Sequence, residues 1–285
     1  MLRHGYILLL LLLTACAGAG DRRLVLDAAG SFPAALSESS GLVAWPEGGF
    51  ISHNDSGKAA ELFVLDQQGG LRYRLPVAAP NRDWEDIARH GNTLYLADTG
   101  NNGGRRRDLR IFRLELSAED AGIPVTLPVR YREQLNFQPP RYQHNFDAEA
   151  LAWVNGELWL FTKRWLDQQS ALYRLDPGGN SDPLTEWQRL NPHMLVTGAD
   201  FDAASQTLLL VGYSRSLFDR RAFAWLYPVR DKRVVESAGR RFRLNETGQF
   251  EAIALGEDGH VYLSREGAAP QLFRSRLPLS RLQAR

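Results

Sequence analysis

The sequence predicts an all-β fold, a β-propeller of five four-stranded blades, with six blades as the alternative. Short apolar runs of β type recur along the chain, separated by Gly, Asn, Asp and Pro, whereas helical periodicity is scarce. One hairpin-like pattern returns five times. Its spacing suits a propeller blade, which usually takes about 40–50 residues.

Each repeat has a lead acid, a small or apolar run, a turn, and an apolar strand that ends in polar residues. The lead acids stand 47, 64, 51 and 51 residues apart; they are Glu38, Glu85, Glu149, Asp200 and Glu251. Third-strand candidates such as ELFVLD and ALYRLD follow the hairpins. The 64-residue interval leaves room for a sixth blade, but residues 117–145 contain no second lead acid, which favours five.

The two ends of the repeat array complete each other. The last repeat runs out of chain after its third strand, while the strand-like sequence RRLVLDAAG (residues 22–30) stands unassigned ahead of the first repeat. Pairing this N-terminal strand into the last blade would close the ring and remove an open sheet edge.

The first residues read as an export signal. A short basic region precedes the apolar residues 7–13, a run too short to span a bilayer but typical of a secretory signal peptide. The sequence LTAC (residues 13–16) looks like a bacterial lipobox, which is cut before its cysteine. We therefore predict a signal peptide over residues 1–15, a lipidated tether over 16–21 and one propeller domain over 22–285. An ordinary signal peptide cut elsewhere is the alternative.

Lipidation of Cys16, the only cysteine, would attach the protein to a membrane. By the sorting rule for such lipoproteins, Ala17 in place of Asp implies the outer membrane, so we expect a periplasmic, lipid-anchored protein. The net charge of +1 gives no electrostatic reason to expect a nucleic acid. We expect a monomer whose partner is a small molecule or an envelope protein.

The lead acid and the polar tail of each hairpin fall at the same end of two antiparallel strands, so all five repeats face a common mouth. The tails provide candidate ligand-binding residues: His53, Asn54, Lys163, Arg164, Arg215 and Arg265. Oxygen-bearing residues provide candidate ligands for a hard cation such as Ca²⁺: Glu38, Asp55, Glu85, Asp98, Asn101, Glu149, Asp200 and Glu251.

Several acids at one mouth need compensation, because like charges repel strongly at short range. Backbone amides of neighbouring blades, a bound cation, or the Arg and Lys residues of the tails would each provide it. A zinc site is not expected, because the six histidines are scattered and no cysteine remains to assist them. Residues 117–145 are either a partial lid over the mouth or an ordinary blade insertion.

Two functions follow. The first is a module that binds a ligand or a protein, with its specificity unknown. The alternative is a divalent-cation-dependent hydrolase of lactones, esters or phosphate esters, with a mouth carboxylate as general base. The sequence has no G-x-S-x-G motif and no free thiol that would indicate a nucleophilic enzyme.

The strands DWEDIA, DAEALA and FEAIAL resemble the bacterial propellers of the SdiA-regulated and phytase-esterase-like groups, and more remotely the gluconolactonase/regucalcin propellers. The resemblance implies a propeller with a divalent cation at its axial mouth. In the gluconolactonase group a Glu, Asn and Asp set holds the metal. Glu38 would match that Glu, and the other ligands have no assigned counterparts.

Overall fold

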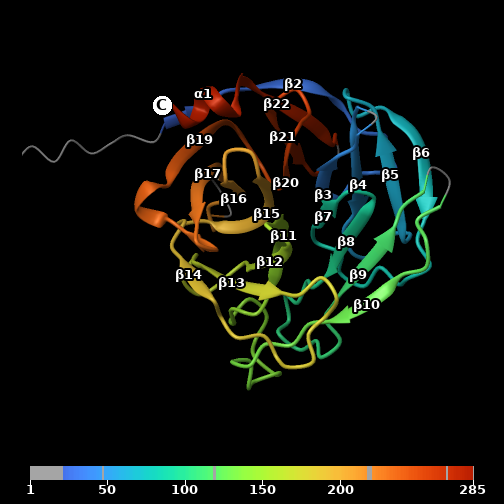
Figure 1. Cartoon of the computed structure of the whole chain (residues 1–285), viewed down its shortest axis with the longest axis vertical. Coiled ribbons are helices and arrows are strands. Elements are labelled where there is room, and N and C mark those ends of the chain that lie inside the picture. The colour runs from blue at the N-terminus through green and yellow to red at the C-terminus, as the bar shows by residue number, and fades with distance from the viewer. Residues whose placement is uncertain (1–21, 47, 118–119, 217–219, 268, 285) are drawn as a thin grey trace, which may run out of the picture.

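The computed structural model describes residues 22–284 apart from 47, 118–119, 217–219 and 268. Figure 1 shows a ring of sheets around a central axis. Blade 1 comprises β3 (Ser39–Ala44), β4 (Phe50–Asn54), β5 (Glu61–Leu65) and β6 (Leu71–Pro76). Blade 2 comprises β7 (Ile87–His90), β8 (Thr93–Asp98), β9 (Arg110–Glu115) and β10 (Val125–Pro128).

The other three blades repeat this order from the axis outward. Blade 3 comprises β11 (Ala148–Val154), β12 (Glu157–Thr162), β13 (Ser170–Leu175) and β14 (Gln188–Leu190). Blade 4 comprises β15 (Leu195–Asp202), β16 (Thr207–Tyr213), β17 (Arg221–Arg230) and β19 (Arg240–Thr247), with the short β18 (Arg233–Val234) paired to β17. Blade 5 comprises β20 (Phe250–Leu255), β21 (His260–Arg265), β22 (Gln271–Pro278) and β2 (Leu26–Ser31).

The N-terminal strand closes the ring, as predicted. β2 pairs antiparallel with β22, so that Leu26 lies opposite Ser275, and Figure 1 shows the two strands side by side at the rim. The preceding β1 (Arg22–Leu24) pairs in parallel with β19 of blade 4. The side-chain amide of Asn245 accepts from the Leu26 amide at 2.8 Å and donates to the Leu26 carbonyl at 3.1 Å. The N-terminal segment therefore joins blades 4 and 5.

The five-blade prediction is confirmed. Among the described residues of 117–145 the only strand is β10, the outer strand of blade 2, so the long second interval holds an insertion rather than a sixth blade. After β22 comes the short helix α1 (Leu279–Gln283), and β18 is followed by a 3₁₀ turn (Glu236–Ala238). Within the described residues no helix is both long and apolar enough to cross a membrane. The predicted signal peptide, tether and Cys16 lie outside the described residues.

The core lies between the blades. Five clusters of buried apolar side chains each join two adjacent blades, and together they pass once around the ring. Tight hairpins support this packing. Asn155 and Gly156, between β11 and β12, both have positive φ (48° and 90°), as a two-residue turn matched to strand twist requires.

Candidate functional site

β-bulges near the start of the inner strands decide which residues face the mouth. The register shifts at Glu149 on β11 and at Glu251 on β20, and Glu85 lies just ahead of β7. In blades 1 and 4 the shift falls at Gly41 and Thr197 instead. The expected set of five equivalent lead acids is therefore corrected to three, because two blades lack an acid at the bulge.

The axial mouth holds a cavity of about 220 Å³. Five acids and two cationic residues line it, together with aromatic and amide side chains; the charged residues are Asp55, Glu85, Glu149, Glu251, Glu266, Lys163 and Arg220. A second, more open hollow of about 650 Å³ adjoins it and shares Asp55 and Glu266. Carboxylates therefore outnumber cationic side chains in the lining of this cavity.

Two groups of carboxylates approach closely enough to share a cation. One ligand atom from each of Asp55, Asp83 and Glu85 lies within 4.8 Å of the others, and the same holds for Glu85, Asp147 and Glu149. Glu85 belongs to both groups. It is only 5 % exposed, and among the described residues no hydrogen bond or ion pair reaches its carboxylate. Gly100 leaves room for that carboxylate, since a Cβ there would lie 2.0 Å from Glu85 Oε1.

Burial and mutual repulsion disfavour the charged forms of these acids. Burial, with the charge of Glu149 beside it, raises the pKa of Glu85 well above its usual range. Burial also raises the pKa of Asp83 to about 7 and that of Glu266 to about 8, in each case with neighbouring carboxylates adding to the effect. A divalent cation would reverse this balance by favouring the ionised forms.

Lys163 compensates part of the charge. Its Nζ lies 2.7 Å from Glu149 Oε2. The same atom lies 5.0 Å from the centre of the Trp165 ring and 5.3 Å from that of Tyr213. Burial acts against the ammonium, but the carboxylate of Glu149 is close enough that the pKa of Lys163 is raised well above its usual range. Lys163 therefore stays charged and holds Glu149 in place.

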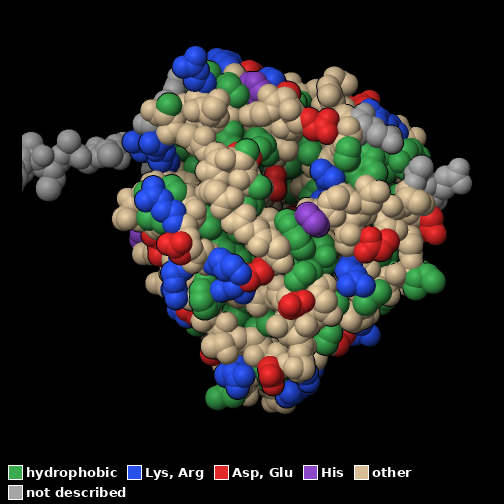
Figure 2. Space-filling view, in the orientation of Figure 1, with side chains coloured by type: hydrophobic (Ala, Val, Ile, Leu, Met, Phe, Trp, Pro, Cys, Tyr) green, Lys and Arg blue, Asp and Glu red, His purple; other side chains and the backbone are tan. Residues whose placement is uncertain are grey.

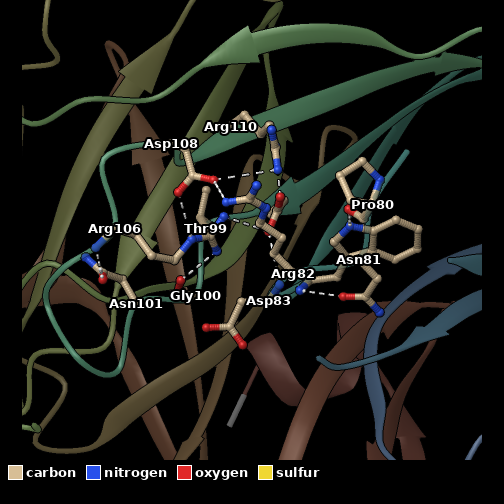
Figure 3. A network of polar contacts seen from close by, with 12 residues as sticks. Pro80, Asn81, Arg82, Asp83, Thr99, Gly100, Asn101, Arg106, Asp108 and Arg110 are labelled. Atoms are coloured by element: carbon tan, nitrogen blue, oxygen red, sulfur yellow. Dashed lines mark hydrogen bonds and ion pairs between the residues drawn. The ribbon is translucent and has the colours of Figure 1, made fainter. Parts of the chain in front are cut away.

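Asp98 and Asn101 belong to a structural network beside the mouth. The Asp98 carboxylate accepts hydrogen bonds from Arg106 Nη2 at 2.9 Å and Arg110 Nε at 2.8 Å, and Figure 3 shows these two arginines with Asp108 in the same network. The Asn101 side chain accepts from the Arg106 amide and donates to the Phe146 carbonyl. Their oxygens are thus committed to protein groups.

Other predicted residues also face protein. The Asn54 side chain accepts from the Glu38 amide and donates to the Ala35 carbonyl. His53 is buried, its Nδ1 lies 3.0 Å from the Asn54 carbonyl, and burial lowers its pKa to about 4. The Glu38 carboxylate is 44 % exposed, lies 3.5 Å from Lys58, and borders only the outer hollow.

The three predicted arginines do not line the mouth cavity. Arg164 forms a bidentate ion pair with Asp167 at 2.9 and 2.5 Å. Arg265 lies 3.4 Å from Glu246, and Arg215 is exposed. The arginine that does line the cavity, Arg220, comes five residues after Arg215 in the same connection.

The candidate site residues named from the sequence did not include Asp83, Asp147, Glu266 or Arg220, which the structure places at the mouth. A signal for the first two was present, because DWE and DAE each place an aspartate two residues before a lead acid. Asp147 accepts hydrogen bonds from the Asn101 amide at 2.5 Å and Trp165 Nε1 at 2.7 Å, which aim it at the mouth.

The long insertion reaches the mouth, as the lid interpretation expects. Tyr142 lines the cavity and has a left-handed backbone conformation (φ 61°). Its backbone N–H donates a hydrogen bond to the Asn102 carbonyl, which supports this conformation. Its ring lies 4.4 Å from that of Trp165. The insertion therefore supplies an aromatic side of the cavity.

Asp86 and Asp200 are ties between blades. Asp86 is 1 % exposed, and its carboxylate accepts from the amides of Ile87, Leu151 and Ala199, which belong to blades 2, 3 and 4. Asp200 accepts from the amides of Phe201 and Leu255 at 2.7 Å each. It lines a separate hollow of about 550 Å³ at the far end of the axis, so its expected place at the common mouth is corrected. Figure 2 shows this far face, hollowed at its centre.

No protein-family model and no curated protein matches the chain. Among solved structures, the PQQ-bound aldose sugar dehydrogenase of Streptomyces coelicolor is 13% identical, with a TM-score of 0.51 over 88% of this chain and 97% of that chain. A glucose dehydrogenase is also 13% identical, with a TM-score of 0.52 over 87% and 99%. These likenesses support the β-propeller fold alone, because both identities are low.

Proposed function

We propose that the mouth binds a hard divalent cation, with Ca²⁺ as the first choice, and that the protein is a ligand-binding module built around that cation. The observation that carries this proposal is Glu85, which is 5 % exposed and whose carboxylate receives no hydrogen bond from the described residues and lies within 4.8 Å of partners in two carboxylate groups. A buried carboxylate with no partner is costly, and Ca²⁺ accepts the 6–8 oxygen ligands that such a cluster offers.

Glu85 would take the central ligand position, with Asp55 and Asp83 on one side and Asp147 and Glu149 on the other. Lys163 would keep Glu149 oriented. The remaining space of the cavity, beside Arg220 and Tyr142, would admit a ligand that completes the coordination. Lipid anchoring through Cys16 would place this module in the periplasm, at the outer membrane.

A cation-dependent hydrolase of lactones, esters or phosphate esters is the second candidate. One observation favours it: acids remain in the mouth after a cation has taken its ligands. Glu251 and Glu266 lie in blade 5, outside both carboxylate groups, and the Gln249 side chain donates to each of them. Either would serve as a general base toward a cation-bound water. Membership of the SdiA-regulated or phytase-esterase-like groups, proposed from the strand motifs, agrees with both candidates.

Thermal unfolding of the EDTA-treated protein, with and without added Ca²⁺, tests the proposal. A ligand of the folded state at 100 times its dissociation constant raises stability by about 2.7 kcal/mol. We expect such a rise with the wild type and its loss in Glu85→Gln. The control is Glu38→Gln, which changes an acid outside both groups and should keep the rise. No stabilisation by Ca²⁺, Mg²⁺ or Mn²⁺ would refute the cation site.

A further inference from the structure

The far end of the axis holds a separate cavity, and the cation-binding proposal does not use it. This far hollow, of about 550 Å³, shares no lining residue with the mouth cavity. Residues from the inner strands and hairpins of all five blades line it. Its volume lies within the roughly 300–1,000 Å³ that is typical of small-molecule sites.

The far hollow has both polar and apolar walls, and the polar surface is the larger. Its walls include Val43 from blade 1, Trp153 from blade 3, Phe201 from blade 4 and Leu255 from blade 5. Trp153 is held in place by two rings that stack on it, His90 at 4.4 Å and Tyr95 at 5.4 Å. The walls therefore offer a firm surface for an apolar group.

Arg89 supplies a cation that lacks an acidic partner. It is half-buried, one N–H of its Nη1 donates to the Gly91 carbonyl at 2.8 Å, and its guanidinium lies 6.0 Å from the Trp45 ring. Among the described residues no carboxylate forms an ion pair with it, and no hydrogen bond uses its Nε–Nη2 edge. That edge has the fork geometry that binds a carboxylate with two parallel hydrogen bonds.

Asp200 supplies a carboxylate in the same hollow; burial raises its pKa, and hydrogen bonds from the Leu255 and Phe201 amides oppose that shift. Its two oxygens each accept one backbone amide, which fixes the carboxylate in place. A carboxylate has about four acceptor positions, so about two remain for a ligand. The charge of Asp200 acts on Arg89: burial lowers the pKa of Arg89, and the carboxylates of Asp200 and Glu257 oppose that effect. A ligand with an anion alone would meet these acids, whereas a ligand with both charges suits both side chains.

We propose that the far hollow binds a small zwitterion, an α-amino acid with an apolar side chain. Its carboxylate lies on the free edge of Arg89, its ammonium group faces Asp200, and its side chain packs against the apolar walls. This site is independent of the cation at the mouth, since Asp86 ties three inner strands together between the two cavities.

Calorimetric titration of the intact protein with L-leucine tests the proposal, using two probes that each lack one charge. 4-Methylpentanoate lacks the ammonium group, and 3-methylbutylamine lacks the carboxylate. We expect saturable binding of leucine and affinities at least tenfold weaker for both probes. If 4-methylpentanoate bound as tightly as leucine, Asp200 would not bind the ammonium group; if 3-methylbutylamine did, Arg89 would not bind the carboxylate. No binding of leucine at millimolar concentration would overturn the site.

Substitutions distinguish the contribution of the Arg89 guanidinium to leucine binding from that of surface charge in general. Arg89→Gln should weaken leucine binding at least tenfold, and Arg89→Lys, which keeps the charge but loses the fork, should recover it only in part. Arg230→Gln is the matched control, because Arg230 is an exposed arginine at the end of β17 that does not line the hollow. Equal affinity of the wild type and Arg89→Gln would overturn the role of Arg89, and Ca²⁺ stabilisation should be the same in both.

Discussion

At the mouth the buried carboxylates face one another, whereas along the axis and at its far end they face backbone amides. Glu85 and Asp86 are adjacent in sequence and show both situations. The Glu85 carboxylate has no hydrogen-bond donor among the described residues, while that of Asp86 accepts three amides from three blades. Burial alone therefore does not distinguish a functional acid from a structural one; the presence of donors does.

Asp86→Ala gives the largest effect expected from this comparison. It leaves the amides of Ile87, Leu151 and Ala199 buried without an acceptor, and each such group costs about 1–3 kcal/mol. We expect a loss of about 3–6 kcal/mol in the free energy of unfolding, measured by urea denaturation. A loss below about 1 kcal/mol would show that Asp86 is not a tie.

The pH dependence of stability should follow the mouth acids. Asp83, with its pKa near 7, and Glu266, with its pKa near 8, bind more protons in the folded than in the unfolded state at neutral pH. Without a cation, stability should therefore fall by roughly 2–4 kcal/mol between pH 5 and 8. Thermal unfolding in EDTA measures this fall, and saturating Ca²⁺ should reduce it. A stability that rises over this range would contradict the mouth electrostatics.

His53 should act in the opposite direction at acid pH. Its pKa near 4 in the fold lies below the unfolded value of about 6.5, so the unfolded state takes up its proton first. Stability contributed by neutral His53 is therefore lost as pH falls from about 6.5 towards 4. The two effects overlap between about pH 5 and 6.5, where His53 offsets part of the loss of stability that the mouth acids cause as pH rises.

Glu85→Gln gives a smaller effect of opposite sign to Asp86→Ala. It removes one charge from a group of repelling carboxylates, so in EDTA at pH 8 we expect stabilisation by about 1–2 kcal/mol. The matched change is Asp86→Asn, one residue later, which also removes a charge. It replaces one accepting oxygen with an NH₂ group that faces backbone N–H groups, so we expect it to destabilise the fold. Destabilisation of both variants in thermal unfolding would erase the distinction between the two acids.

The sequence predicted the blade number, the strand order and the closing strand, because these depend on a repeat whose signal adds up over five hairpins. The exact mouth residues depend on single positions. Asp200 lies three residues after the bulge at Thr197, and Glu38 lies three before the bulge at Gly41, so both were assigned to the wrong register. A bulge inserts one residue into a strand, so the side chains beyond it point to the opposite side of the sheet. A single sequence does not show reliably where a bulge lies.

The contacts between arginines and acids were beyond prediction for another reason. Arg164 and Arg220 look equivalent in sequence, yet one meets Asp167 and the other lines the mouth. The Arg164–Asp167 pair is local, with its partners three positions apart in the sequence, whereas the place of Arg220 at the mouth depends on how separate connections meet in space. The acids Asp83 and Asp147, in contrast, were within reach of a search for the repeated D-x-E pattern.

The joining of β2 to β22 also has a kinetic consequence. The hydrogen bonds that connect Leu26 to Asn245 link residues 219 positions apart, and blade 5 is complete only when β2 is in place. Such distant pairing makes folding slow and leaves strand edges exposed until late. A nascent chain could form the hairpins of blades 1 to 4 early, but the ring would close only after blade 5 had been synthesised. The exposed edges of blade 5 would therefore persist until the whole chain is available.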